Sequence, residues 1–168
     1  MNRRSNTIFA VLVGMAIVFG AILPACQAQA QEQAQDDNPL KALLDQTGLK
    51  YKKLDDTSWI VPFDAKEGKT IDVYLTYNDD KKKFALIFST VVDKDDNYEF
   101  GKEVLAEAMK LNNDFPGIKY CLDSDHGDID VQSEVYMPAL NAEVLTMYVN
   151  LVAQMADDNA EKLNALVR

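Results

Sequence analysis

Cysteine and histidine are scarce in this sequence, which has two cysteines and one histidine in 168 residues. It contains no Cys-x-x-Cys pair and no pair of histidines that could hold a transition metal together. The Gly-rich phosphate loop and the Gly-x-Ser-x-Gly nucleophile motif are also missing. These absences argue against dithiol, zinc, nucleotide-hydrolysing and serine-hydrolase sites. We therefore expect no cofactor and no catalytic or metal-ligating residues.

Basic residues are outnumbered by acidic ones, 17 against 27, which gives a formal net charge of −10. Binding to nucleic acid or to an anionic membrane surface requires a basic stripe, so neither partner is expected. The only basic cluster is Lys81–Lys83, which follows Asp79 and Asp80 in an expected turn. This placement is typical of a solvated loop.

Long apolar runs are also rare, and the clearest one, Ile8–Leu23, directly follows Arg3 and Arg4. The run is shorter than the roughly 20 residues that a membrane-spanning helix needs. A basic start, an apolar stretch and small residues near a polar flank are typical of a secretory signal peptide. Ala28-Gln29-Ala30 fits the cleavage rule, so we expect residues 1–30 to be removed and the mature chain to be periplasmic or secreted.

An alternative processing route involves Cys26. Leu23-Pro24-Ala25-Cys26 resembles a lipoprotein signal, in which Cys26 would be acylated and would anchor an outer-membrane lipoprotein. In both cases Cys121 is left without a disulfide partner. Cys121 lies in an expected strand and His126 in the turn after it, so the two side chains are not expected to form a nucleophile and its base.

The sequence beyond a Gln- and Ala-rich linker at residues 31–37 predicts a single domain at 38–168. Asn38 and Pro39 are typical of a helix start, and Gly48 is typical of a helix end. Alternation and apolar runs predict strands over 51–63 (with a turn at 55–56 and closed by Pro62), 70–77 and 84–92. The remaining predicted elements are a helix over 98–112, strands over 118–123 and 128–137, and a helix over 140–167 that is interrupted or bent at 157–159. The order α-β-β-β-α-β-β-α predicts an α+β fold in which helices pack on an antiparallel sheet.

Two segments of this domain are candidate interfaces for a homodimer, namely the almost entirely apolar strand 84–92 and the last helix. A central strand of this composition is covered on both faces, or on one face and at an interface. The apolar stripe expected on the last helix consists of Leu140, Val144, Met147, Tyr148, Leu151, Val152 and Met155. This stripe is expected to face the core; the alternative is an adaptable groove lined by Met137, Met147, Tyr148 and Met155.

Two acidic clusters contain the carboxylates that a metal site needs. Asp123, Asp125 and Glu134 occupy the first, third and twelfth positions of an EF-hand loop, but Asp128 stands at the sixth position, where that loop needs Gly. A hairpin explains this segment better. The second cluster, at residues 93–99, is expected to be a loop that complements the dipole of the following helix. A carboxylate pair that acts as general acid and base remains an alternative, because acids are plentiful.

The element order over 38–167 resembles that of the YbjN-like proteins, which share the type III secretion chaperone-like fold. The segments that carry the resemblance are 59–61 (Trp-Ile-Val), 71–75 (Ile-Asp-Val-Tyr-Leu), 84–88 (Phe-Ala-Leu-Ile-Phe), 109–113, 119–123, 128–131 and the last helix. The resemblance implies a small acidic domain, often a homodimer, that binds another polypeptide and has no catalytic residues.

Secretion chaperones work in the cytosol, whereas this sequence carries an expected export signal. The expected function is therefore exported, non-enzymatic binding of a protein or peptide, rather than delivery of effectors. The alternatives are an envelope-anchored lipoprotein of structural role and a hydrolase that uses a carboxylate pair.

Overall fold

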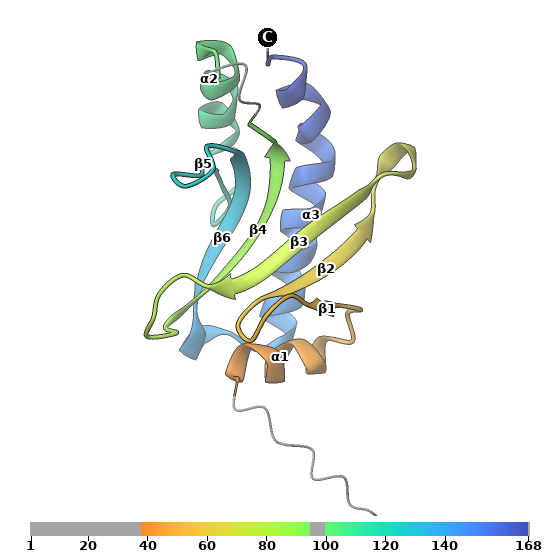
Figure 1. Cartoon of the computed structure of the whole chain (residues 1–168), viewed down its shortest axis with the longest axis vertical. Coiled ribbons are helices and arrows are strands. Elements are labelled where there is room, and N and C mark those ends of the chain that lie inside the picture. The colour runs from red at the N-terminus through yellow and green to blue at the C-terminus, as the bar shows by residue number, and fades with distance from the viewer. Residues whose placement is uncertain (1–37, 95–99, 168) are drawn as a thin grey trace, which may run out of the picture. The chain divides into compact units, whose positions relative to one another are not determined.

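The structure, a computed structural model, describes residues 38–94 and 100–167 (Figure 1). The expected signal peptide, the linker and Cys26 lie outside these residues. The helices are α1 (Pro39–Thr47), α2 (Lys102–Leu111) and α3 (Ala142–Asn164), with 3-10 turns η1 (Lys66–Gly68) and η2 (Met137–Ala139). The strands are β1 (Lys52–Lys53), β2 (Trp59–Asp64), β3 (Thr70–Tyr77), β4 (Phe84–Val92), β5 (Lys119–Leu122) and β6 (Ile129–Tyr136).

The described strands form one six-stranded antiparallel sheet in the order β1-β2-β3-β4-β6-β5. The long helix α3 packs against β3, β4 and β6, while α1 packs on α3 and α2 packs on β5 and α3. Figure 1 shows α3 running behind the sheet. The predicted α+β fold of helices on an antiparallel sheet is thus confirmed. None of the described helices is long and apolar enough to cross a membrane.

Helix α1 has the ends that its sequence predicts. The Asn38 side-chain oxygen accepts hydrogen bonds from the backbone N–H groups of Leu40 and Lys41, and Pro39 occupies the first turn. At the other end, Gly48 has a φ of 73°, the left-handed conformation that ends many helices.

The core lies between the sheet and α3. Side chains alternate along a strand, so one face of β3 and β4 supplies Val73, Leu75, Ala85 and Ile87, all 0% exposed. The sheet-facing side of α3 supplies fully buried apolar residues spaced by three or four positions, including Leu145, Val149 and Val152. This burial, more than intrinsic helix propensity, stabilises α3.

Two predicted interruptions are wrong. Strand β2 continues through Pro62 to Asp64, because β1 pairs only as far as Ile60 and Pro62 lies where β2 is the edge strand. Helix α3 continues through residues 157–159. The polar side chains there have partners that are compatible with the helix: Asp157 accepts from the Lys66 N–H, and Asn159 donates to the Tyr120 hydroxyl and to the Met155 carbonyl oxygen one turn back. They therefore do not compete with the helix.

The stripe predicted on the last helix is partly wrong. Val152 and Met155 are buried, but Met147 is 51% exposed, and the fully buried Leu145 and Val149 were not in the stripe. The cause is the helix start. Leu140 is extended and the N-cap is Asn141, so a helical phase counted from Leu140 points to the wrong side. Because Met155 is buried and Met147 exposed, the methionines do not line one groove.

Candidate protein-binding site

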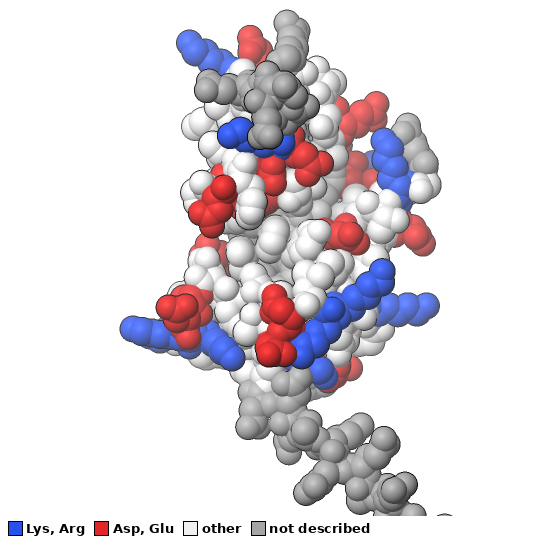
Figure 2. Space-filling model, in the orientation of Figure 1, with Lys and Arg blue, Asp and Glu red and all other residues white. Residues whose placement is uncertain are grey.

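One face of the sheet has none of the described helices packed on it. We call this the outer face. It carries the strand residues that alternate with the core positions. Apart from Pro62 and Cys121, six of them are apolar or aromatic: Ile60, Tyr74, Phe84, Leu86, Phe88 and Tyr136. We call these six the outer-face stripe. Figure 2 shows this side of the molecule, where uncharged atoms run across the middle and charged side chains lie around them.

Strand register brings the outer-face stripe together. Ile60 pairs with Tyr74, and Tyr74 pairs with Phe88, so three strands contribute neighbouring side chains. The rings of Tyr74 and Phe88 are stacked, with centroids 5.1 Å apart. Phe84 and Tyr136 form a second pair, with centroids 5.4 Å apart and exposed fractions of 39% and 49%. Aromatic pairs that remain partly exposed on an open sheet face are typical of a surface that a partner covers.

The stripe leads into an apolar groove beside α1. The groove has a volume of about 400 Å³ and is lined by Pro39, Ala42, Leu43, Tyr136, Met137, Pro138 and the lysines Lys82 and Lys83. Lys81–Lys83 are exposed in the turn between β3 and β4, as predicted, but two of them also border this groove. The outer-face stripe and the groove together form a continuous surface through their shared residue, Tyr136.

A buried acid lies at the other end of the outer face. Asp130 is 5% exposed, and its carboxylate accepts a 2.7 Å hydrogen bond from the Thr90 hydroxyl. Burial raises the pKa of the Asp130 carboxyl, and the Thr90 hydrogen bond offsets part of this shift. Cys121 pairs with Asp130 across β5 and β6, and burial raises the pKa of its thiol as well. A raised thiol pKa is the opposite of what a nucleophilic cysteine needs.

The acids that could have formed an EF-hand serve the turn of a hairpin. Asp123 Oδ1 accepts hydrogen bonds from the backbone N–H groups of Asp125 and His126, at 2.6 and 3.0 Å. Residues 129–136 form β6, which pairs with β5 and confirms the predicted hairpin. His126 is exposed and its Nδ1 lies 3.7 Å from Asp123 Oδ2. Among the described residues, no three His, Cys, Asp or Glu side chains are placed to hold a metal ion.

The aromatic pairs of the outer face were not recognised from the sequence. Alternation in 70–77 assigned Tyr74 to the polar side of its strand, and the apolar run 84–92 gave no indication of which side faces solvent. The signal lay in the register, which the sequence did not predict: a turn at 78–80 places Tyr74 opposite Phe84, whereas the connection between paired residues spans 78–84 and places Tyr74 opposite Phe88.

No family model and no curated protein matches the sequence. Several solved structures are similar. The HopA1–SchA chaperone–effector complex matches with a TM-score of 0.53 and 17% identity, over 73% of this chain and 94% of that one. The ExsC–ExsE complex matches with a TM-score of 0.51 and 16% identity, over 74% and 90%. YbjN from E. coli matches with a TM-score of 0.52 and 15% identity, over 77% and 92%. At these identities the likeness concerns the fold, and the chain has the YbjN-like, type III secretion chaperone-like fold that its element order predicts.

Proposed function

We propose that this chain is an exported domain that binds another polypeptide over its outer-face stripe and catalyses no reaction. The observation that carries the proposal is the arrangement of the sheet, in which the described helices lie on one face and aromatic pairs lie on the other. A free polypeptide can bury these rings and remove apolar area from water, at about 25 cal/mol per Å².

Polar groups around the stripe fit the same role. Protein interfaces combine an apolar centre with a polar rim. Asp72 pairs with Pro62 at one side of the stripe, and Glu134 pairs with Leu86 at the other. One of the similar structures is a chaperone–effector complex, which supports a polypeptide as the partner here. From the signal sequence expected at residues 1–30, we propose that this binding takes place outside the cytoplasm.

The test is site-specific crosslinking in cells that express the full chain. A photo-reactive amino acid replaces Thr76 or Gln132 on the outer face, or Asn150 on the exposed side of α3 as a control. We expect polypeptide adducts from the two outer-face positions and none from position 150. Introducing Phe84→Ser should remove the adducts. Equal labelling from all three positions, or none from the outer face, would contradict the proposal.

The same cells distinguish the two processing routes. We propose that the mature chain begins at Gln31 and is free in the periplasm or secreted. Acylation at Cys26 would instead give a membrane-bound chain that begins at Cys26 and carries a lipid mass. An intact mass spectrum of the soluble and membrane fractions separates these outcomes.

A second copy of the chain could also cover the outer-face stripe. Self-association would bury the same aromatic pairs, and light scattering at tens of micromolar detects it. If the chain is a monomer by light scattering and still gives adducts from position 76, the partner is a different polypeptide.

A further inference from the structure

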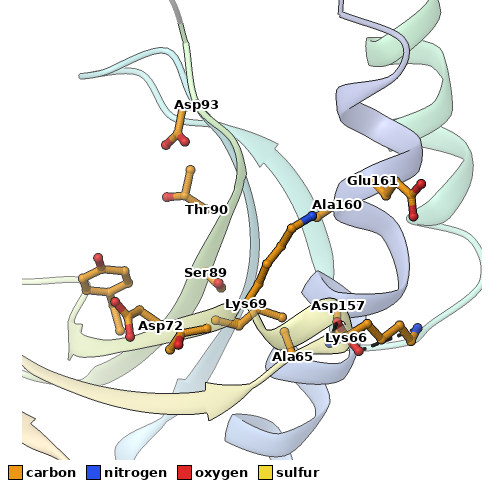
Figure 3. A pocket seen from close by; sticks show the side chains of 13 residues that line it. Ala65, Lys66, Lys69, Asp72, Ser89, Thr90, Asp93, Asp157, Ala160 and Glu161 are labelled. Carbon is orange, nitrogen blue, oxygen red and sulfur yellow. Dashed lines mark hydrogen bonds and ion pairs between the residues drawn. The ribbon is translucent and has the colours of Figure 1, made fainter.

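Strands β3 and β4 are paired along only half of their length. Their register runs from Tyr74 opposite Phe88 to Tyr77 opposite Ala85, and the rest of each strand, 70–73 and 89–92, has no partner in the other. The two strands diverge beyond this point (Figure 1), and a cleft of about 500 Å³ opens between them. Figure 3 shows this β3–β4 cleft, with β4 on one side, β3 below and α3 on the opposite side.

Contacts with α3 hold the cleft open. At the β3 side, the backbone N–H of Lys66 in η1 donates to Asp157 Oδ1 at 3.0 Å. At the β4 side, the Asn164 side-chain amide donates to the Val91 carbonyl oxygen at 2.7 Å. Asp157 and Asn164 are two turns apart on α3, or about 10 Å at 1.5 Å per residue. These two contacts fix η1, which leads into β3, and the end of β4 at different positions along α3, and the cleft lies between them.

One hydroxyl group on the wall of the cleft forms no hydrogen bond with the described residues. Ser89 is 3% exposed and lines the cleft on the side of β4 that faces α3. Among the described residues, nothing bonds to its hydroxyl, whereas the neighbouring Thr90 hydroxyl is bonded to Asp130. The Ser89 hydroxyl reaches the open cleft, where it can donate a hydrogen bond to a ligand or accept one from it.

Carboxylates dominate the walls of the cleft. Asp72, Asp93, Asp157 and Glu161 line it, against the two cations Lys66 and Lys69. Lys66 pairs with Asp158, with Nζ to Oδ1 at 2.6 Å, and with Asp157 at 3.6 Å. Lys69 extends across the cleft toward α3 (Figure 3). Asp72 and Glu161 add negative charge beyond the pairs of Lys66, which favours a ligand that carries basic groups.

We propose that the β3–β4 cleft accepts an extended basic segment of a partner polypeptide, which inserts as a strand between β3 and β4. The edges at 70–73 and 89–92 supply backbone hydrogen-bonding groups, as in other cases of strand addition. Lysine or arginine side chains on the α3-facing side of the inserted strand meet Glu161 and the Ser89 hydroxyl. Side chains on the other side meet Asp72. The identification of the ligand as a polypeptide rests on the proposed function. The position and charge of the cleft do not depend on it.

The experiment uses the mature chain and capped hexapeptide probes. One probe alternates lysine and valine, a second alternates glutamate and valine, and a third is the lysine peptide with alternate backbone nitrogens methylated. We expect the lysine peptide to bind at least ten-fold more tightly than the other two. It should shift the amide NMR signals of residues 70–73 and 89–92. Equal binding of the methylated peptide, or shifts confined to other residues, would overturn strand insertion.

Variants separate the cleft from the outer-face stripe. Glu161→Gln, on the α3 wall of the cleft, should weaken binding of the lysine peptide about five-fold, and Ser89→Ala should weaken it about three-fold. Glu143→Gln removes an exposed acid from the first turn of α3, outside both the cleft and the outer face; it is the matched control and should leave binding of the lysine peptide unchanged. Spermidine that shifts the same amides with equal affinity would show a site for small cations and overturn the proposal. Crosslinking from Thr76 and Gln132 reports the proposed function separately, so failure of one leaves the other measurable.

Discussion

Tyr74 and Phe88 form the last residue pair at which β3 and β4 are still joined, and their rings stack with centroids 5.1 Å apart and planes inclined by 19°. On one side of this pair the ladder continues to Tyr77 and Ala85. On the other side the strands separate and the β3–β4 cleft begins. The stacked rings therefore lie both in the outer-face stripe and at the mouth of the cleft, which makes them the most informative position for mutation.

The first prediction concerns Phe88. Its ring is half-buried and its partner ring comes from the neighbouring strand, so Phe88→Ala should lower the free energy of unfolding by only about 1 kcal/mol. If the ring lies at the centre of the binding surface, loss of partner affinity should be at least about ten-fold. Urea unfolding measures the first quantity and crosslinking yield from Thr76 the second. Ile87→Ala, on the buried side of the same strand, is the control and should have the reverse profile.

The second prediction concerns the pH dependence that Asp130 causes. Burial raises the pKa of this carboxyl in the folded state above its unfolded value. Between these two pKa values the folded chain binds more protons than the unfolded chain, so stability falls as pH rises through this interval. Asp130→Asn removes this loss and keeps an acceptor for the Thr90 hydroxyl.

The variant should thus be more stable than the parent at pH 7, and the difference should shrink as pH falls below about 4, where both states carry a protonated Asp130. Paired urea titrations at pH 3.5, 5 and 7 test this. A difference between variant and parent that is constant with pH would show that the pKa of Asp130 is not raised.

The third prediction concerns Tyr120. Its hydroxyl donates to the Met155 carbonyl oxygen at 3.0 Å and accepts from the Asn159 side chain at 2.9 Å. Burial raises the pKa of Tyr120 to about 12, so this phenol remains protonated at ordinary pH. Tyr120→Phe should destabilise the fold by about 1–2 kcal/mol, since it removes a buried hydrogen bond that joins β5 to α3. Tyr136→Phe, on the exposed end of β6, should be near neutral by the same urea measurement.

The sequence predicted those parts of the fold that depend on local periodicity. The bounds of β3 and β4 agree with the expected 70–77 and 84–92, because clean alternation or a continuous apolar run is readable within one strand. The side of α3 that faces the core was not predicted correctly, because it depends on whether Leu140 or Asn141 starts the helix. The β3–β4 cleft was also beyond sequence reasoning. It depends on contacts such as Lys66 with Asp157 and Val91 with Asn164, which are 91 and 73 residues apart.

The last prediction concerns Asn38, which joins α1 to the sheet. Its Oδ1 accepts from two N–H groups of the first turn and from the Tyr77 hydroxyl, at 2.7 Å for the latter. Its Nδ2 donates to the Asp56 carbonyl oxygen at 3.1 Å, and the residue is 5% exposed. Asn38→Ala leaves several buried groups unsatisfied and should cost about 2–3 kcal/mol of unfolding free energy.

Asn141→Ala is the matched control, because Asn141 caps α3 with a single hydrogen bond to the Val144 N–H at 2.9 Å and is exposed. It should cost only about 1 kcal/mol. Because Pro39 and Leu43 of α1 line the apolar groove, Asn38→Ala should also weaken crosslinking at that end of the outer face, while Asn141→Ala should not. Equal costs for the two caps would mean that Asn38 acts as an ordinary helix cap, and that the position of α1 beside the groove does not depend on its link to Tyr77.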